Sequence, residues 1–145
     1  MQQNVRETEP TNPAEARKQI LLRRDIALDD IKKRRGKIHD RIDELNLLST
    51  QQDLSSGQKK EFDDLVAAKD ALNDAESELQ LATLEALDKS AANDLVKRLN
   101  DVNAMLVKKL KKVERVSEQL TKLAELVRKI DGVIQSVTKL ATLIP

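Results

Sequence analysis

The chain has 145 residues, of which 35% are charged and 1% aromatic, with a formal net charge of +1 at pH 7. This length suits one domain with a modest core, and the balanced charge excludes a global field that would attract nucleic acid or anionic membrane. The absence of cysteine excludes disulfides and thiolate metal sites. Many Leu, Ala, Lys, Glu and Asp residues, with three glycines and three prolines, are typical of long helices, so we expect an all-α protein.

Residues 1–12 are polar and follow no apolar period, which predicts a disordered N-terminal arm. Three signals then mark the start of a helix: Asn12 is a good N-cap, Pro13 suits the first helical position, and Glu15 can reach back to the cap. This helix is expected over residues 13–49, ahead of a polar, serine-rich turn. Its predicted buried positions, at steps of three or four residues or their sum, are Leu21, Leu28, Ile31, Ile38, Ile42 and Leu45.

A second helix is expected over residues 57–88, with Ser55 and Gln58 as a capping box at its start. Leucine and alanine alternate along its predicted buried face, and alanines seven residues apart form a shallow groove that lets a neighbouring helix approach closely. The apolar pattern changes phase near residues 88–94, where we expect a tight turn; one bent helix is the alternative. The predicted buried positions are Leu65, Ala68, Leu72, Ala75, Leu79, Ala82 and Ala86.

A third helix is expected over residues 91–143, because the apolar period there is the most regular in the sequence. Apolar side chains at alternating steps of four and three continue from Leu95 to Ile144 with Lys109 as the exception. A sustained period of 3.5 residues predicts a supercoiled helix seam, and a helix of this length would extend about 80 Å. The fifteen positions are Leu95, Leu99, Val102, Leu106, Lys109, Val113, Val116, Leu120, Leu123, Val127, Ile130, Ile134, Val137, Ala141 and Ile144.

Charge distribution favours antiparallel packing of these three helices. Residues 54–89 carry four basic and nine acidic side chains, whereas the segments before and after them are net basic. An acidic helix between two basic ones has complementary flanks. The predicted fold is therefore an elongated, up-down-up three-helix bundle with coiled-coil-like seams and a long protruding C-terminal helix.

The C-terminal part of the third segment is predicted to carry an interface. Besides the seam, Leu126, Val133 and Leu140 form a second apolar stripe, which widens the face beyond the reach of the two shorter helices. Another copy of the chain, a helical partner or a membrane surface would have to bury it. The predicted interface residues are Leu123, Leu126, Val127, Ile130, Val133, Ile134, Val137, Leu140 and Ile144.

The other charged features of the sequence indicate helix surface rather than a binding site. The basic run Lys32–Lys37 points around the whole helix rather than along one face, and the chain has no aromatic side chain there to stack on a base, which argues against nucleic acid. His39, the only histidine, lacks the Glu-x-x-His pairs of helical di-metal sites. Lys109, Arg24 and Arg35 fall on predicted seams, where a charge either fixes register or reaches out to solvent.

The sequence assigns no catalytic, cofactor-binding or metal-binding residue, and we expect no enzyme. The leading hypothesis is a non-catalytic interaction or assembly protein that acts through coiled-coil or helix–helix contacts, with itself or another helical protein. The alternative is a membrane-active protein, either a pore-forming component or a membrane-remodelling factor, that uses the amphipathic C-terminal helix. The sequence has no apolar leader and no run of about 18 apolar residues, so a soluble, cytoplasmic protein is expected.

Overall fold

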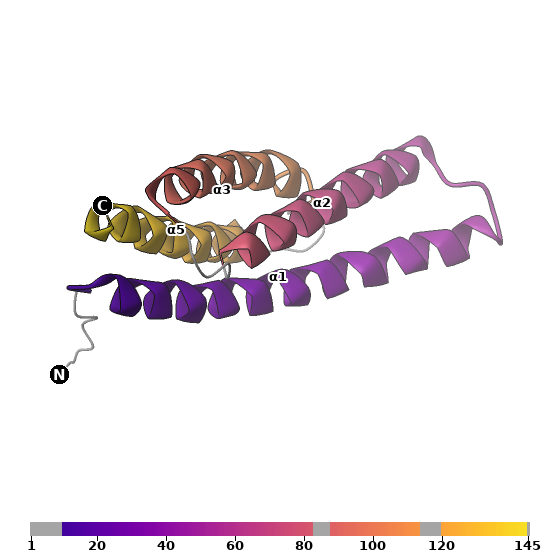
Figure 1. The fold of residues 1–145 in the computed structure, drawn as a ribbon. Helices are drawn as coiled ribbons and strands as arrows, with labels where there is room; N and C mark the ends of the chain where they lie inside the picture. Colours follow the sequence, from indigo (N-terminus) through magenta and orange to yellow (C-terminus); the bar gives the residue numbers. More distant parts are fainter. Residues whose placement is uncertain (1–9, 83–87, 114–119, 145) are drawn as a thin grey trace.

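The computed structural model describes residues 10–82, 88–113 and 120–144. These residues form helices without any strand, which confirms the predicted all-α class for this part of the chain. Residues 1–9 of the predicted N-terminal arm lie outside the described residues. In chain order the helices are α1 (Pro13–Ser49), α2 (Ser56–Leu81), α3 (Lys89–Leu110) and α5 (Leu120–Leu143), shown in Figure 1.

Helix α1 is the long element along which the others are arranged (Figure 1). It covers the predicted range, and the Asn12 side chain accepts a hydrogen bond of 2.9 Å from the backbone N–H of Glu15, as the capping signals indicate. The N-terminal half of α1 packs against α5, and its C-terminal half packs against α2. Helix α3 packs against both α2 and α5, so the contacts close a ring of neighbouring helices.

The predicted break between the second and third helices exists, but it lies earlier than the expected residues 88–94, because α3 is helical from Lys89 onward. Helix α2 ends at Leu81, short of the expected residue 88, and residues 83–87 lie outside the described part. Asp88 is the N-cap of α3, and its side chain accepts a hydrogen bond of 2.8 Å from the backbone N–H of Ala91. A new helix therefore begins here, which excludes the alternative of one bent helix. Figure 1 shows α2 and α3 running in opposite directions.

The predicted third helix over residues 91–143 is wrong, because α3 ends at Leu110 and α5 folds back beside it. Asn103 on α3 donates a hydrogen bond of 2.9 Å to Asp131 on α5. In one continuous helix, 28 residues would separate these side chains by about 42 Å. The described chain thus forms a bundle with α5 as an additional helix, and not a three-helix bundle with a protruding end. Burial of α5 against two helices favours this fold-back over a longer solvated helix.

The buried face of α3 explains the apparent exception in the predicted seam. The seam placed Val102 and Lys109 inside, but the structure leaves both half-buried and buries Asn103 and Leu110. Leu95, Leu99 and Leu106 are buried as predicted, so the buried face of α3 is displaced from the predicted seam by less than one residue. The buried positions of α3 are Ala92, Leu95, Leu99, Asn103, Leu106 and Leu110.

The predicted buried face of α1 agrees with the structure in part, and that of α2 agrees at every described position. In α1, Ile20 and Ala27 are buried, while Leu21 is exposed and Leu28 half-buried; Ile31, Ile38, Ile42 and Leu45 are buried as predicted. In α2 every predicted position within the described residues is buried, and Ala86 lies outside them. Ala68 and Ala75 of α2 have no exposed surface, so the Leu/Ala face packs closely against its neighbours.

Candidate interaction site on the C-terminal helix

Helix α5 lies between α1 and α3 and uses its broad apolar face against both. Most of the nine predicted interface residues are inside the chain's own core. Leu123, Leu126, Ile130, Val133, Val137 and Leu140 are buried, whereas Val127, Ile134 and Ile144 are half-buried and pack against the core. The premise that the rest of the chain cannot cover this face does not hold in the structure, because α1 and the folded-back α3 cover it.

The two apolar stripes of α5 correspond to its two neighbours. Lys129 and Ser136, which contact α1, lie on the side of the stripe Leu126, Val133 and Leu140. The stripe Val127 and Ile134 lies on the opposite side, where Asp131 and the Val127 carbonyl accept hydrogen bonds from Asn103 of α3. The second stripe therefore indicates a second neighbouring helix, and this helix is α1.

A buried carboxylate fixes the contact between α1 and α5. Asp30 on α1 accepts a hydrogen bond of 3.0 Å from Lys129 Nζ and forms an ion pair of 3.0 Å with Arg34 Nε. The side chain of Asp30 is only 10% exposed. A carboxylate so far from water is stable as an anion when cations surround it, and here one comes from each helix.

One turn further along α5, an arginine of α1 lies over a glycine. Arg23 Nη1 donates hydrogen bonds of 3.0 Å to the Gly132 carbonyl and 3.2 Å to Ser136 Oγ. Ser136 Oγ in turn donates 3.0 Å to the Gly132 carbonyl. A Cβ atom at Gly132 would lie 3.5 Å from Arg23 Cδ, an ordinary van der Waals contact, so the arginine stem passes directly over the glycine. These contacts fix the register of the antiparallel pair α1–α5.

The contact between α3 and α5 contains a buried amide. Asn103 Nδ2 donates to Asp131 Oδ1 at 2.9 Å and to the Val127 carbonyl at 3.4 Å, while Asn103 Oδ1 is buried without a hydrogen-bond donor. Such a polar group costs stability relative to an apolar residue but favours one register over its alternatives. The burial of Asp30, Asn103 and Ser136 could not be predicted from the sequence, since polar residues on an amphipathic helix give no local signal of burial.

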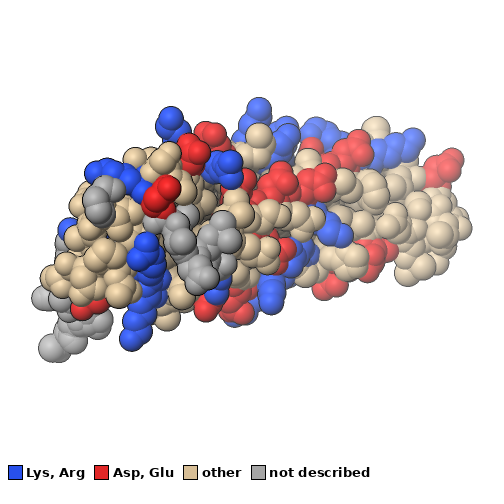
Figure 2. All heavy atoms as spheres, viewed as in Figure 1, with Lys and Arg blue, Asp and Glu red and all other residues tan. Residues whose placement is uncertain are grey.

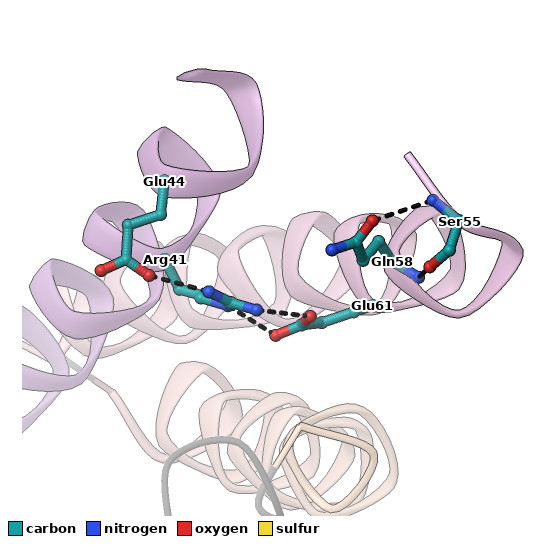
Figure 3. A network of polar contacts seen from close by, with 5 residues as sticks. All are labelled: Arg41, Glu44, Ser55, Gln58 and Glu61. Carbon is teal, nitrogen blue, oxygen red and sulfur yellow. Dashed lines mark hydrogen bonds and ion pairs between the residues drawn. The ribbon is translucent and has the colours of Figure 1, made fainter. Parts of the chain in front are cut away.

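At the other end of the molecule, α1 and α2 form a hairpin joined by an arginine network, shown in Figure 3. Arg41 makes a bidentate contact with Glu61, with distances of 2.8 Å from Nε and 3.0 Å from Nη2, and donates 2.9 Å to Glu44. These hydrogen bonds raise the pKa of Arg41. Ser55 and Gln58 make the predicted capping box at the start of α2. The hairpin is held by charged contacts on its outer side and an apolar face between the helices.

The basic run Lys32–Lys37 supplies several of the ion pairs of α1. Lys33 pairs with Asp29 at 3.2 Å, Arg34 pairs with Asp30, and Arg35 donates to Glu76 of α2. The hydrogen bond from Arg35 lowers the pKa of Glu76 below its usual value, although burial opposes this shift. Figure 2 shows basic and acidic groups interleaved over the visible face, rather than a basic surface.

His39 and the remaining seam charges lie at helix surfaces. His39 Nε2 is 3.3 Å from Asp43 Oδ2, and its Nδ1 is 3.3 Å from Lys69 Nζ, with 53% of the side chain exposed. Within the described ranges, no three His, Asp or Glu side chains gather where they could hold a metal ion. Arg24 turns toward Asp25, its neighbour in the chain, and Lys109 is half-buried at the edge of α3.

Comparison with known proteins gives no match: none of the protein families, curated proteins or solved structures agrees with this chain. Among the described residues, no helix combines the length and the apolar character needed to cross a bilayer.

Proposed function

We propose that this protein is a non-catalytic helical assembly protein that acts through coiled-coil or helix–helix contacts, with α5 as the element that binds another chain. This proposal rests on the two apolar stripes of α5. One apolar stripe fits α1, another fits α3, and polar pairs on each side define a single register. Such a helix is a specific ligand for a groove between two helices, which is a recurring mode of protein recognition.

The partner under this proposal is a second copy of the chain or another helical protein that offers an equivalent groove. Support comes from the spacing of the buried apolar residues of α5, at alternating steps of three and four from Leu123 to Val137, since a helical partner requires such a stripe and a lipid surface does not. The buried polar residues Asp30 and Asn103 also fit a protein groove. A helix with matching polar groups would bind there more tightly than a helix without them.

A membrane-active protein that inserts α5 into a lipid surface is the competing function. The apolar stripes of α5 and the cations Arg128 and Lys139 are features of interfacial helices. However, Lys129 is engaged with Asp30, and the apolar side chains would have to leave the core of the protein to reach lipid, as they would to reach another chain. Only a measurement with vesicles separates this function from assembly.

The test measures mass and lipid binding on the full-length chain. Light scattering over a range of micromolar concentrations is expected to give a mass that rises above that of the monomer. Co-sedimentation with neutral and anionic vesicles at physiological salt is expected to leave the protein in the supernatant. A monomer at every concentration would remove self-association from the proposal. Vesicle binding that persists at physiological salt would favour the membrane-active function instead.

A further inference from the structure

We propose that two copies of the folded chain associate through the outer side of α1, with their α1 helices antiparallel about a twofold axis. The contact surface is an exposed stripe that we call the outer stripe. Its members lie on the side of α1 opposite the buried face and are Glu15, Lys18, Leu22, Ile26, Asp29 and Lys33. This inference goes beyond the proposed function, because α5 stays in the core of each copy.

The outer stripe is open to solvent in the single chain. The other described helices lie on one side of α1 (Figure 1), and all six residues of the stripe are exposed. Because steps of three and four residues match the turn of an α-helix, the six side chains fall within an arc of about 80°. At the centre of the stripe, Leu22 is 60% exposed and Ile26, one turn later, is 48% exposed. Two large apolar side chains flanked by charged ones have the arrangement of an interface core with a polar rim.

The order of charges along the outer stripe is complementary to itself when it is reversed. From the N-terminus the stripe reads acidic, basic, apolar, apolar, acidic, basic. An antiparallel second copy, followed in the same direction, reads basic, acidic, apolar, apolar, basic, acidic. Each acidic residue therefore faces a basic one, and the apolar residues face each other at the centre. Charge patterns of this kind select the partner and the orientation of paired helices.

The spacing of the stripe defines the register of the contact, with the twofold axis near residue 24. The three facing pairs, each of which occurs twice in the dimer, are Glu15 with Lys33, Lys18 with Asp29 and Leu22 with Ile26. A contact in which every pair occurs twice is isologous, the usual symmetry of a homodimer. The stripe is about 27 Å long, so the contact is small and the dimer is expected to be weak.

The contacts of the stripe within its own chain leave its charges able to bind a second copy. Lys33 pairs with Asp29 at 3.2 Å, but both side chains are largely exposed, so this pair contributes little. The hydrogen bond from the Thr11 backbone N–H lowers the pKa of Glu15, so this carboxylate is charged at neutral pH. An ammonium group has three donors and a carboxylate about four acceptor positions, so each can add a partner across the interface.

The charge balance of the outer stripe favours a second copy over a lipid surface. The stripe carries two acidic and two basic side chains, so it has no net charge to attract anionic lipid. The two carboxylates would be repelled by such a surface, whereas a second copy pairs all four charges.

Charge reversal in the full-length chain tests this pairing. In one variant, Glu15→Lys with Asp29→Lys makes every charge of the stripe basic. In the other, Lys18→Glu with Lys33→Glu makes every charge acidic. Each variant alone places like charges together in all four charged contacts of a dimer, so its dimerisation constant is expected to fall at least about tenfold. An equimolar mixture restores four opposite-charge contacts and should dimerise at least as strongly as the wild type. Sedimentation equilibrium at micromolar to millimolar concentrations measures the mass.

The mixture also brings together chains of opposite net charge, which requires a matched control. Asp94→Lys with Asp101→Lys, and separately Lys97→Glu with Lys108→Glu, make the same changes at exposed positions of α3. Helix α3 lies across the ring of helices from α1. At physiological salt, where charges further apart than about 8 Å are screened, each control alone should dimerise within about threefold of the wild type. Circular dichroism checks that all variants fold.

A variant without a charge change tests the apolar centre. Leu22→Gln is expected to lower the dimerisation constant about tenfold, because the leucine is buried twice in each dimer. Leu47→Gln is the matched control, since Leu47 is 64% exposed on the same helix but lies beyond the stripe. This control should leave dimerisation within about twofold.

Loss of the dimer in each charge variant and its recovery in the mixture support the contact through α1. A dimer that the stripe variants leave unchanged overturns this inference, while self-association through another surface stands. Equal losses in the α3 controls also overturn it, because net charge would then govern association. A wild-type chain that stays monomeric up to millimolar concentration overturns the contact as well. The stripe variants leave α5 unaltered, so the binding of another helical protein by α5 is tested separately.

Discussion

Lys129 on α5 donates a hydrogen bond of 3.0 Å to Asp30 on α1, which lies 99 residues earlier in the chain. Arg34, one turn after Asp30, forms an ion pair with the other carboxylate oxygen. The first and last described helices are thus joined by a carboxylate that is largely shielded from water. A charge in such a place is costly unless its partners are present, which makes Asp30 a sensitive position.

We expect Asp30→Ala to lower the free energy of unfolding by about 2 kcal/mol, because Arg34 and Lys129 would lose their shared anion at a half-buried site. Asp29→Ala is the matched control in the same helix, since Asp29 and its partner Lys33 are both more than two-thirds exposed. The control should change stability by less than about 0.5 kcal/mol. Urea melts followed by circular dichroism measure both variants. Equal effects would mean that Asp30 does not join the helices in solution.

Ala75 lies at the centre of the buried Leu/Ala face of α2 and has no exposed surface. Ala75→Leu should therefore overpack the helix contact and cost about 1–3 kcal/mol. Ala124→Leu, on an exposed position of α5, makes the same change where space is free and should have an effect within about 0.5 kcal/mol. If urea melts show no loss for Ala75→Leu, α2 does not pack as closely as the structure indicates.

Gly36 lies in the interior of α1, and a Cβ atom there would meet nothing within 4 Å. Gly36→Ala should raise the free energy of unfolding by about 1 kcal/mol, because alanine restricts the unfolded chain and favours the helix. Gly132→Ala should gain no more than this, since its Cβ would contact the stem of Arg23. A loss of stability at Gly36 in thermal melts would show that α1 is not a regular helix there.

The ion pair between Arg35 and Glu76 should make stability depend on pH in the acidic range. Because the pKa of Glu76 is lowered from 4.5 in the folded state, its contribution is fully present at neutral pH. As the pH falls below 4.5, the unfolded chain takes up a proton first, so the contribution declines. The stability difference between wild type and Glu76→Gln should be constant near neutrality and shrink below that pH. A difference that grows on acidification would contradict the pairing.

The sequence predicts the fold well where local chemistry determines it. Asn12 and Pro13 place the start of α1, and the capping box with Ser55 places the start of α2, because these signals act within four residues. The Glu15 carboxylate accepts hydrogen bonds from Thr11 and not from the Asn12 cap that it was expected to reach. The buried face of α2 follows from the spacing of its leucines and alanines. These features depend only on neighbours in the chain.

What could not be predicted depends on distant neighbours. No residue of 111–119 signals a turn, so the fold-back after α3 is decided by the burial of α5 against α1. The pairs of Asp30 with Lys129 and of Asn103 with Asp131 were missed for the same reason. The predicted seams differ from the buried faces at alternate positions, such as Val102 for Asn103 and Val127 for Leu126, because the spacing of apolar residues does not say on which side the neighbouring helices lie.

The division of α1 between two partners has a consequence for the order of folding. Its C-terminal half meets α2, with Arg41 and Glu61 only 20 residues apart, whereas its N-terminal half meets α5, with Arg23 and Ser136 separated by 113 residues. Closing the longer loop costs more chain entropy and takes longer. We therefore expect the α1–α2 hairpin to form before the N-terminal half of α1 packs against α5. During synthesis on the ribosome, that half lacks its contacts with α5 until α5 itself has emerged.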